Sequence, residues 1–260
     1  MQVLQSRAES TLRIERRDAL ALLKLDKPRG NAIDETLIRD LAAACDELRR
    51  DDTLRGVLLG SGHPKLFCPG LDLVSLFEYD RQGMGRFMTA FSDAVLALFA
   101  LEKPVVAAVS GHAVAGGCIL ALTADMRLLR RGAQIGLNEV KVGVPLPWDV
   151  AVLLRHTVNP GALTRVALLG RNFADDEAVE VGLADAVLEA EGFEAECVKR
   201  LVEFVDKQPS AVAATKRYLR AAALAEMRAR QRELQPEWLD AWFSPETRGR
   251  IEQIVAGLTH

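Results

Sequence analysis

Two segments of this 260-residue chain repeat one arrangement, in which a strand-like run ends in a glycine-rich loop and the loop opens into a helical pattern. The first runs from Leu59-Gly60-Ser61-Gly62-His63 into Phe67-Cys68-Pro69-Gly70-Leu71-Asp72. The second runs from Val109-Ser110-Gly111-His112 into Ala115-Gly116-Gly117-Cys118. A repeated strand–loop–helix unit favours a superhelical core of stacked β and α elements.

Hydrophobic periodicity along the chain predicts alternating strands and helices. A hairpin is expected over 12–17 and 19–25, followed by a helix that Asp34 caps and short strands at 56–59, 105–109, 126–129 and 134–136. The apolar positions of that helix are Leu37, Leu41, Ala44, Cys45 and Leu48, and those of a later long helix are Phe87, Phe91, Val95 and Leu98. After a helix stop at Gly182, helical patterns cover 193–205 and 210–230. The sequence therefore predicts an α/β fold, with a core over 1–200 and a C-terminal helical region over 201–260.

Composition excludes several functional classes. The formal net charge is -3, and basic and acidic residues are interspersed, so no charged tail indicates nucleic acid or a membrane surface as a partner. The four cysteines are far apart in the sequence and lack metal-ligand spacing, which predicts small buried residues and no metal site. The first thirty residues contain no continuous apolar block, so we expect neither a signal peptide nor a membrane span and predict a cytoplasmic protein.

The two glycine loops have a chemical implication. Glycine allows the backbone to approach a ligand closely, and the amides at a helix start are free to donate. Two such loops could direct two N–H groups at one oxygen, which is what stabilises an enolate. Dinucleotide binding is a rival explanation for such loops, but neither loop contains GxGxxG or the phosphate-loop pattern.

Several motifs, in this order and spacing, resemble the crotonase superfamily of enoyl-CoA hydratases and isomerases. They are residues 27–33 (KPRGNAI), 67–73 (FCPGLDL), 115–118 (AGGC), 136–143 (GLNEVKVG), 176–178 (DEA), 181–185 (VGLAD) and 215–216 (TK). The resemblance covers nearly the whole chain. It implies a core of repeated β-β-α units, a C-terminal helical region used for oligomerisation, and acyl-CoA thioesters as substrates.

The resemblance also implies roles for individual residues. The oxyanion donors would be the backbone N–H groups of Leu71 and Gly116. Hydratases of the family use two glutamates, at the positions of Ile119 and Glu139, and here only Glu139 is present. An isoleucine cannot exchange a proton and disfavours an ordered water. The chain therefore looks most similar to the Δ3,Δ2-enoyl-CoA isomerase branch, in which one glutamate moves the double bond from the 3- to the 2-position.

Substrate contacts are likewise implied by the resemblance. The coenzyme A part and the thioester arm would be bordered by Ala32, Pro69, Gly70, Asp72, Leu73 and Asn138. Lys27 and Arg29 are candidates for phosphate contact. No cofactor is expected beyond the coenzyme A carried by the substrate.

Two alternatives stay open beside the isomerase. Asp149 is a candidate second acid, and an inward orientation would favour a hydratase or dehydratase; a non-catalytic acyl-CoA-binding protein is the third class. Trp148 is expected in the core or in a pocket wall. Cys68 lacks an activating partner in the sequence, and His63 and His112 are expected to hydrogen-bond within loops.

The end of the chain is predicted to mediate oligomerisation. Trp238, Trp242 and Phe243 are expected to form an exposed apolar stripe that docks onto a neighbouring subunit. The resemblance makes this neighbour a second copy of the chain, in a homotrimer or a dimer of trimers.

Overall fold

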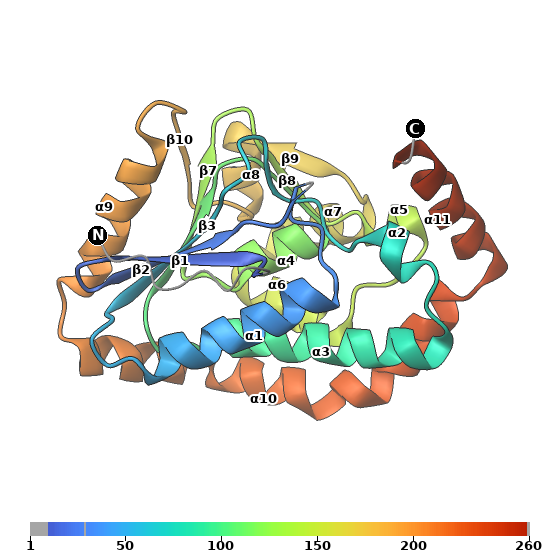
Figure 1. The fold of residues 1–260 in the computed structure, drawn as a ribbon, viewed down its shortest axis with the longest axis horizontal. Helices are drawn as coiled ribbons and strands as arrows, with labels where there is room; N and C mark the ends of the chain where they lie inside the picture. Colours follow the sequence, from blue (N-terminus) through green and yellow to red (C-terminus); the bar gives the residue numbers. More distant parts are fainter. Residues whose placement is uncertain (1–9, 29, 259–260) are drawn as a thin grey trace.

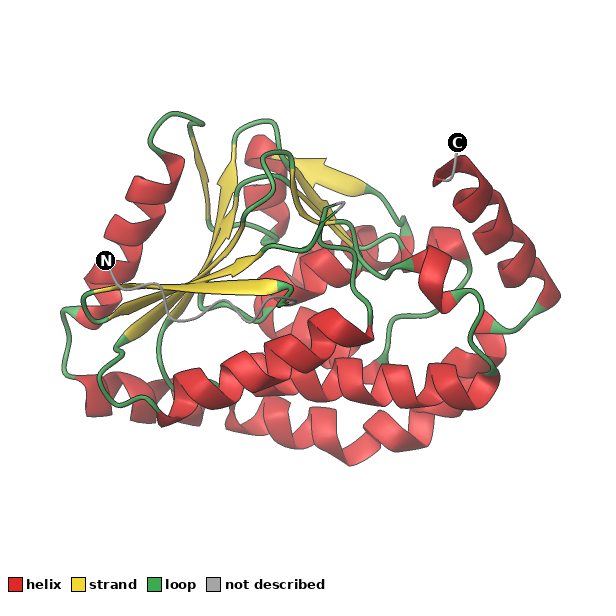
Figure 2. Ribbon diagram, viewed as in Figure 1, coloured by secondary structure: helices red, strands yellow, loops and turns green. Residues whose placement is uncertain are grey.

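The computed structural model describes residues 10–28 and 30–258, which form two β-sheets with helices packed around them (Figures 1 and 2). The first sheet has the strand order β1-β2-β3-β5-β7-β10 and the second the order β4-β6-β8-β9. The strands are β1 (Leu12–Arg17), β2 (Leu20–Leu25), β3 (Gly56–Ser61), β4 (Leu66–Cys68), β5 (Val105–Val109), β6 (His112–Val114), β7 (Met126–Arg130), β8 (Gln134–Gly136), β9 (Asn172–Ala174) and β10 (Ala186–Leu188). The predicted α/β class is confirmed.

The helices connect these strands and then continue to the end of the described chain. They are α1 (Glu35–Arg50), α2 (Leu73–Leu76), α3 (Arg81–Phe99), α4 (Gly116–Leu122), α5 (Glu139–Val142), α6 (Trp148–Thr157), the 3-10 helix η1 (Pro160–Ala162), α7 (Leu163–Leu168), α8 (Asp175–Val181), α9 (Phe193–Val205), α10 (Pro209–Trp242) and α11 (Pro245–Leu258). In the described part of the chain, no helix is both long and apolar enough to cross a membrane.

The core is built from a repeated strand–strand–helix unit. The units are β3-β4-α2, β5-β6-α4 and β7-β8-α5, in which the first strand joins the first sheet and the second strand joins the second sheet. β3, β5 and β7 pair in parallel, and so do β4, β6 and β8. The repeated β-β-α core expected from the sequence is therefore confirmed, and equivalent loops lie side by side.

Local sequence explains why the first elements form where they do. β1 and β2 pair as an antiparallel hairpin across Arg17 and Leu20. The Asp34 carboxylate accepts a hydrogen bond from the Leu37 amide at 2.9 Å and so caps α1. The predicted apolar stripes of α1 and α3 are buried. Gly182 ends α8 in the left-handed conformation, as predicted.

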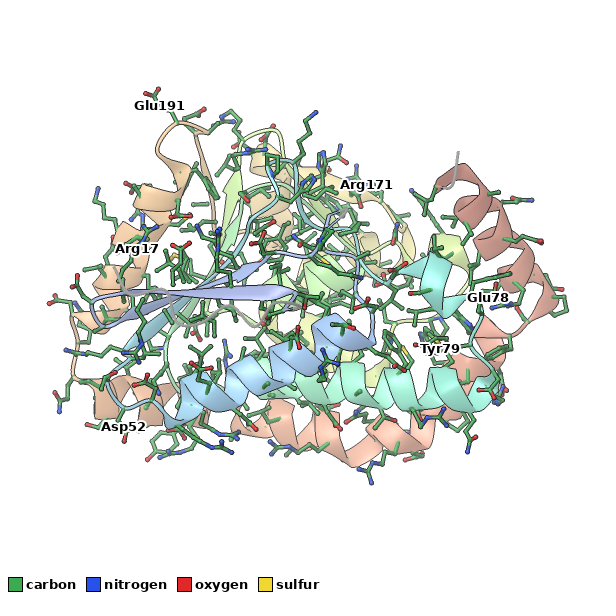
Figure 3. All side chains as sticks on the ribbon, in the orientation of Figure 1. Arg17, Asp52, Glu78, Tyr79, Arg171 and Glu191 are labelled. Atoms are coloured by element: carbon green, nitrogen blue, oxygen red, sulfur yellow. The ribbon has the colours of Figure 1, made fainter. Side chains whose placement is uncertain are left out.

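Alternate residues of β2 supply two separate hydrophobic clusters on the two faces of the first sheet. Ala21, Leu23 and Leu25 belong to the larger cluster, and Leu20 and Leu22 to a smaller one that α9 covers. On the other side, α3 lies between α1 and α10 in Figure 1. Charged side chains project outward, including Arg17, which pairs with Glu194 of α9 at 2.7 Å (Figure 3).

A buried ionic cluster fastens α10 to the core. Asp125, directly before β7, accepts hydrogen bonds from Lys216 at 2.6 Å and from Arg220 at 2.7 Å. The same carboxylate accepts the Val105 amide of β5 at 2.7 Å, and Lys216 also donates to the Lys103 carbonyl. Both cationic side chains are only 8% exposed. These charges are removed from water, and an unpaired buried charge would destabilise the fold. Their mutual pairing therefore allows α10 to pack at this position.

The prediction that Trp238 and Trp242 belong to an exposed apolar stripe is wrong. Trp238 and Trp242 are 4% and 1% exposed, stack on each other with centroids 5.3 Å apart, and belong to the larger hydrophobic cluster. Phe243 is half-buried against the same cluster. The sequence pattern could not distinguish docking onto the chain's own core from docking onto a neighbour. The predicted homotrimer therefore stays a prediction and does not rest on these side chains.

We expect Asp125→Asn to lower the free energy of unfolding by about 3–5 kcal/mol, because two buried cations lose their counter-charge. Urea unfolding would measure the change. The control is Glu102→Gln. Glu102 is the exposed acidic partner of Arg217, which lies on α10 like Lys216 and Arg220. An exposed pair contributes about 0–1 kcal/mol. Equal effects of the two substitutions would contradict the role of the buried cluster.

Candidate active site

Three loops meet at one end of the second sheet. β6 lies between β4 and β8, and all three strands run in the same direction. The loop after β4 contains Gly70 and Leu71, the loop after β6 contains Ala115 and Gly116, and the loop after β8 leads to Glu139. The carboxyl ends of adjacent parallel strands are a common place for ligands. The three groups predicted to act on the substrate are thus brought together.

The N–H of Leu71 points away from the strand segment beside it. Ile33 and Leu71 form an isolated parallel bridge, in which Ile33 donates to the Gly70 carbonyl at 2.8 Å and Asp72 donates to the Ile33 carbonyl at 2.9 Å. Both hydrogen bonds are thus made by the neighbours of Leu71, Gly70 and Asp72. In a parallel pair, the N–H of Leu71 itself then points to the opposite side. Within the described residues the Leu71 amide has no acceptor.

The Gly116 amide lies close to this loop and is free as well. Gly116 is the first residue of α4, so its N–H has no acceptor within the helix. The preceding Ala115 has φ of 49°, a conformation that L-residues rarely adopt, and its N–H donates to the Gly136 carbonyl at 2.8 Å. This hydrogen bond ties the turn to β8. The strained turn holds the Gly116 N–H in a fixed direction.

The loops approach each other so closely that glycine is required. Gly70 has φ of +101°, and a Cβ atom there would lie 3.0 Å from Ala115 Cβ and 3.3 Å from the Gly116 nitrogen. A Cβ atom on Gly117 would overlap the Cys68 carbonyl. Any larger side chain at Gly70 or Gly117 would therefore push the two amide-bearing loops apart.

Glu139 is a buried carboxylic acid with an unpaired oxygen. Its residue surface is 9% exposed, and among the described residues Oε2 has no hydrogen-bond partner. Burial raises the pKa of Glu139 to about 7, although backbone hydrogen bonds from Glu139 itself and from Asn138 oppose the rise. A carboxyl group with a pKa near neutrality can both accept and return a proton at physiological pH.

Glu139 lies within electrostatic reach of α4. Burial raises the pKa of the Cys118 thiol well above its ordinary value, and the charge of Glu139 adds to this rise. The next residue in the sequence, Ile119, is 2% exposed and belongs to the hydrophobic core. The position where the hydratases of the family are expected to have a glutamate is therefore apolar and buried here.

The residues expected to border the substrate lie around the same loops. Pro69 is exposed; Ala32, Leu73 and Asn138 are half-buried; Gly70 is buried. Asp72 caps α2 by accepting the Ser75 amide at 3.3 Å. The structure therefore brings these six residues to one end of the second sheet, and their contacts with coenzyme A stay predictions.

Lys27 does not hold a free charge for a phosphate group. Its ammonium group contacts the Asp34 carboxylate at 2.7 Å, the Ala32 carbonyl at 2.8 Å and the Asp72 carboxylate at 3.4 Å. These three partners account for its three protons. Lys27 thus joins the two predicted substrate loops, and Arg29 lies outside the described residues.

Cys68, His63 and His112 are engaged in contacts near the loops. Burial raises the pKa of the Cys68 thiol to about 12, and its Sγ lies 3.1 Å from the Asn31 carbonyl, which fits a packed and unreactive side chain. His63 Nδ1 accepts the Lys65 and Leu66 amides, and His112 Nδ1 accepts the Gln134 amide. The predicted loop hydrogen bond is confirmed for His63, whereas His112 is the first residue of β6 and bonds to the first residue of β8.

Asp149 is buried but belongs to a different cavity. It is 1% exposed and lines a space between α3, α6 and α10 whose lining does not include Glu139. Trp148 lines the same space and also packs against the core, so both expected environments occur together. The lining of this cavity therefore gives no support, within the described residues, for Asp149 as a second acid beside Glu139.

The sequence patterns gave no sign that α11 supports the site. Thr247 Oγ1 donates to the Gly143 carbonyl at 3.0 Å, at the residue that ends α5. Arg248 donates to the Phe77 carbonyl at 2.8 Å, at the end of α2, and stacks over the Phe77 ring. The last helix thus spans from the end of α2 to the helix that begins with Glu139. Neither residue belongs to a recognisable sequence motif.

Comparisons with known proteins agree with this arrangement. The model of the enoyl-CoA hydratase/isomerase family matches residues 15–252. The chain is similar to mitochondrial enoyl-CoA delta isomerase 1 of Homo sapiens, with 29% identity over 210 residues, which covers 80% of this chain and 70% of that protein. It is also similar to the probable enoyl-CoA hydratase EchA17 of Mycobacterium bovis, with 32% identity over 197 residues, covering 76% and 75%.

A solved structure shows the same fold. Human mitochondrial delta3-delta2-enoyl-CoA isomerase superposes with a TM-score of 0.92 and 24% identity, over 96% of this chain and 98% of that one. The predicted crotonase-like architecture is thereby confirmed. Because the family model spans both sheets, the three loops and the helices around them, the chain belongs to the enoyl-CoA hydratase/isomerase family.

Proposed function

We propose that the protein moves the double bond of a 3-enoyl-CoA ester to the 2-position. The observation that carries this proposal is one buried carboxyl group, with a pKa of about 7, near two unpaired backbone amides at the ends of three adjacent strands. The similarity to human enoyl-CoA delta isomerase 1 supports the same reaction.

The two amides would bind the thioester oxygen. When a proton leaves the carbon next to the thioester, negative charge collects on this oxygen, and donors already fixed in place stabilise it. One such donor contributes about 2.7–4 kcal/mol to the transition state. The N–H groups of Leu71 and Gly116 suit this role because no other acceptor among the described residues competes for them.

Glu139 would carry the proton between two carbons. Its ionised carboxylate removes a proton from C2, the C2–C3 double bond forms as the C3–C4 double bond is lost, and the protonated carboxyl group returns the proton to C4. No net proton, electron or water molecule is gained or lost. A single group can perform both steps because its pKa lies close to the working pH.

Isomerisation is favoured over hydration by the surroundings of Glu139. Water addition in this family was expected to need a second glutamate at the position of Ile119, and Ile119 is apolar and buried. Asp149 lines the cavity between α3, α6 and α10, whose lining does not include Glu139. The relatives include a probable enoyl-CoA hydratase, so isomerisation and hydration must be distinguished by experiment. Incubation with a 2-enoyl-CoA tests for water addition, and incubation with a 3-enoyl-CoA tests for double-bond migration.

Glu139→Gln is expected to lower kcat for a 3-enoyl-CoA by about 100- to 10,000-fold and to leave KM nearly unchanged, because the amide cannot accept the proton. Formation of the conjugated 2-enoyl-CoA, followed by absorbance, would measure it. Glu180→Gln is the control, since this carboxylate is 66% exposed and pairs with Arg165. An active Glu139→Gln protein would remove Glu139 from the role of base.

The pH dependence follows from the pKa of the base. We expect kcat/KM to rise with pH through about 7 and to level off above it, because only the ionised form of Glu139 accepts a proton. The measurement is initial rates across this range with the same ester. A profile governed by a pKa near 4.5, the ordinary glutamate value, would contradict a buried base.

Stability should respond to pH through the same group. The folded pKa is raised above the unfolded value, so the native state holds more protons between pH 4.5 and 7 and loses stability as pH rises through that range. Glu139→Gln cannot ionise. The variant should therefore gain up to about 3 kcal/mol over the wild type above pH 7 and little at pH 4.5, as measured by urea unfolding. A stability difference that does not change with pH would contradict the burial of the charge.

A further inference from the structure

Glu139 begins α5, a helix of a single turn that depends on other parts of the chain for its position. The turn is closed by the Gly143 and Val144 amides, which donate to the Glu139 carbonyl at 3.0 and 3.2 Å. Asn138, which precedes the helix, makes no side-chain capping hydrogen bond. A helix this short is not stable by itself in water. The direction of the Glu139 carboxyl group therefore depends on what holds α5 from outside.

A hydrogen bond from α11 holds the far end of this turn. Thr247 is 3% exposed, and its hydroxyl group donates to the Gly143 carbonyl at 3.0 Å. Within the described part of the chain, this is the one hydrogen bond that reaches residues 139–143 from a distant segment. The contact is close, since a Cβ atom on Gly143 would lie 2.5 Å from Thr247 Oγ1.

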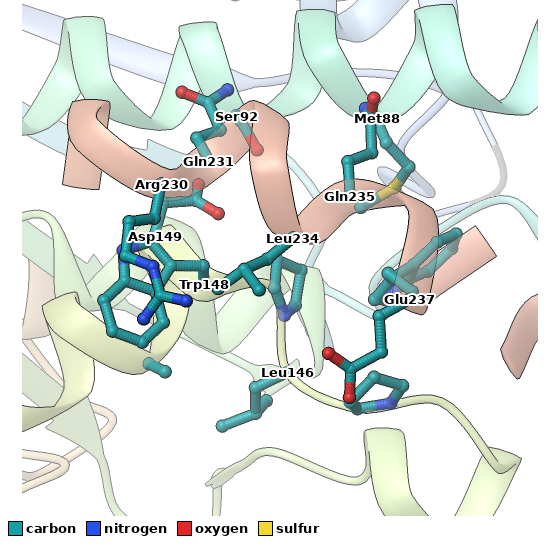
Figure 4. A pocket seen from close by; sticks show the side chains of 14 residues that line it. Met88, Ser92, Leu146, Trp148, Asp149, Arg230, Gln231, Leu234, Gln235 and Glu237 are labelled. Atoms are coloured by element: carbon teal, nitrogen blue, oxygen red, sulfur yellow. The ribbon is translucent and has the colours of Figure 1, made fainter. Parts of the chain in front are cut away.

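The other contacts of α5 restrain it less. Three residues past Gly143, the side chain of Leu146 lines a cavity of about 330 Å³ between α3, α6 and α10 (Figure 4). A cavity gives the chain that leaves α5 fewer packing contacts than a filled core would. Val140 and Lys141 pack near Gly170, where a Cβ atom would lie 2.9 Å from both side chains. Such contacts are not directional, so they fix the orientation of the turn less than a hydrogen bond does.

Thr247 is itself fixed at the start of α11. Its amide donates to the Ser244 hydroxyl at 3.2 Å, as in an N-terminal cap. The next residue, Arg248, donates to the Phe77 carbonyl at 2.8 Å, and its guanidinium group lies 3.6 Å from the centre of the Phe77 ring. Phe77 ends α2, the helix that follows the loop with the Leu71 amide. Thr247 thus connects the turn of the base to the element beside one oxyanion donor.

Resting on the proposed function, we propose that Thr247 is a positioning residue for isomerisation: its hydroxyl group holds α5 so that the Glu139 carboxyl group faces the carbon atoms between which the proton moves. Thr247 acts through the Gly143 carbonyl and not through contact with the substrate. A base that must reach C2 and then C4 tolerates little displacement, since an error of about 1 Å can lower a rate about 100-fold. Thr247 therefore contributes to kcat and not to KM.

The first test is Thr247→Val, which removes the hydroxyl group and nearly keeps the shape of the side chain. We expect kcat for a 3-enoyl-CoA to fall about tenfold, equivalent to about 1.4 kcal/mol, with KM nearly unchanged. Thr247→Ser keeps the donor and should restore most of kcat. Initial rates at varied ester concentration measure both constants. Equal kcat values of the two variants, or a rise in KM in place of a fall in kcat, would overturn the assignment.

Thr157→Val is the matched control. Thr157 is half-buried, and its hydroxyl group also donates to a backbone carbonyl, that of Leu153 at 2.8 Å within α6. This variant should keep the kcat and KM of the wild type. If it loses as much kcat as Thr247→Val, the effect comes from general destabilisation and the assignment is overturned.

A second readout follows the base directly. Burial raises the pKa of Glu139 to about 7, and carbon NMR of isotopically labelled glutamate side chains would measure it, with the signal identified by its loss in Glu139→Gln. Thr247→Val should lower this pKa toward the ordinary 4.5, because a loosened α5 exposes the carboxyl group to water. Thr247→Ser and Thr157→Val should keep it near 7. The Cys118 thiol stays protonated throughout, because burial raises its pKa well above its ordinary value.

Failure of this inference can be told apart from failure of the isomerase proposal. If the wild type isomerises a 3-enoyl-CoA and Thr247→Val keeps its kcat, the isomerase stands and the role of Thr247 is overturned. If the wild type does not turn over a 3-enoyl-CoA, the isomerase proposal fails. The role of Thr247 is then decided by the NMR titration, where a pKa of Glu139 that is lowered in Thr247→Val and kept in Thr247→Ser supports it, and equal pKa values overturn it.

Discussion

The central position of β6 in the second sheet is the constraint on which the site depends. Hydrogen bonding of β6 to β4 on one side and to β8 on the other brings three loops to the same end of the sheet. The bond from the Ala115 amide to the Gly136 carbonyl then locks the turn before Gly116 to the strand that leads to Glu139. A shift of β6 by one residue would reverse the direction of its side chains and separate the Leu71 and Gly116 amides from Glu139.

The protein buries carboxylates in two distinct ways. Asp125 is fully paired with two cations, so its burial stabilises the attachment of α10. Among the described residues, Glu139 and Asp149 each keep one oxygen without a partner, and burial raises the pKa of both. Buried acids that lack a partner cost stability. The difference in pairing therefore separates the carboxylate that anchors α10 from these two carboxylates.

The C-terminal helices complete the surroundings of the loops. α10 packs along α3 and α6 and closes the cavity that contains Asp149, while α11 contacts both α2 and α5. Thr247 and Arg248 thereby restrain the ends of α5 and α2. Both donate to backbone carbonyls, those of Gly143 and Phe77, so their contribution is positional.

The sequence alone determined the order of most elements and the identity of the key groups. The period of apolar residues predicted α1, α3 and α9 and the strands β1, β2, β3, β5 and β7 of the first sheet, because burial of one face is encoded locally; it did not predict β10. The glycine loops and Glu139 were found through their motifs. The pKa of Glu139, the absence of an acceptor for the Leu71 and Gly116 amides among the described residues, and the place of Asp149 in the cavity between α3, α6 and α10 required the structure.

Only the tertiary structure decided what the C-terminal region covers. The apolar pattern of Trp238 and Trp242 predicted a covered face, and the pattern was the same whether the cover was a second subunit or the chain's own core. Packing of α10 onto α3 and α6 buried both rings within the chain. Burial and hydrogen-bond satisfaction depend on residues far apart in sequence, so local periodicity could identify the apolar face but not its partner.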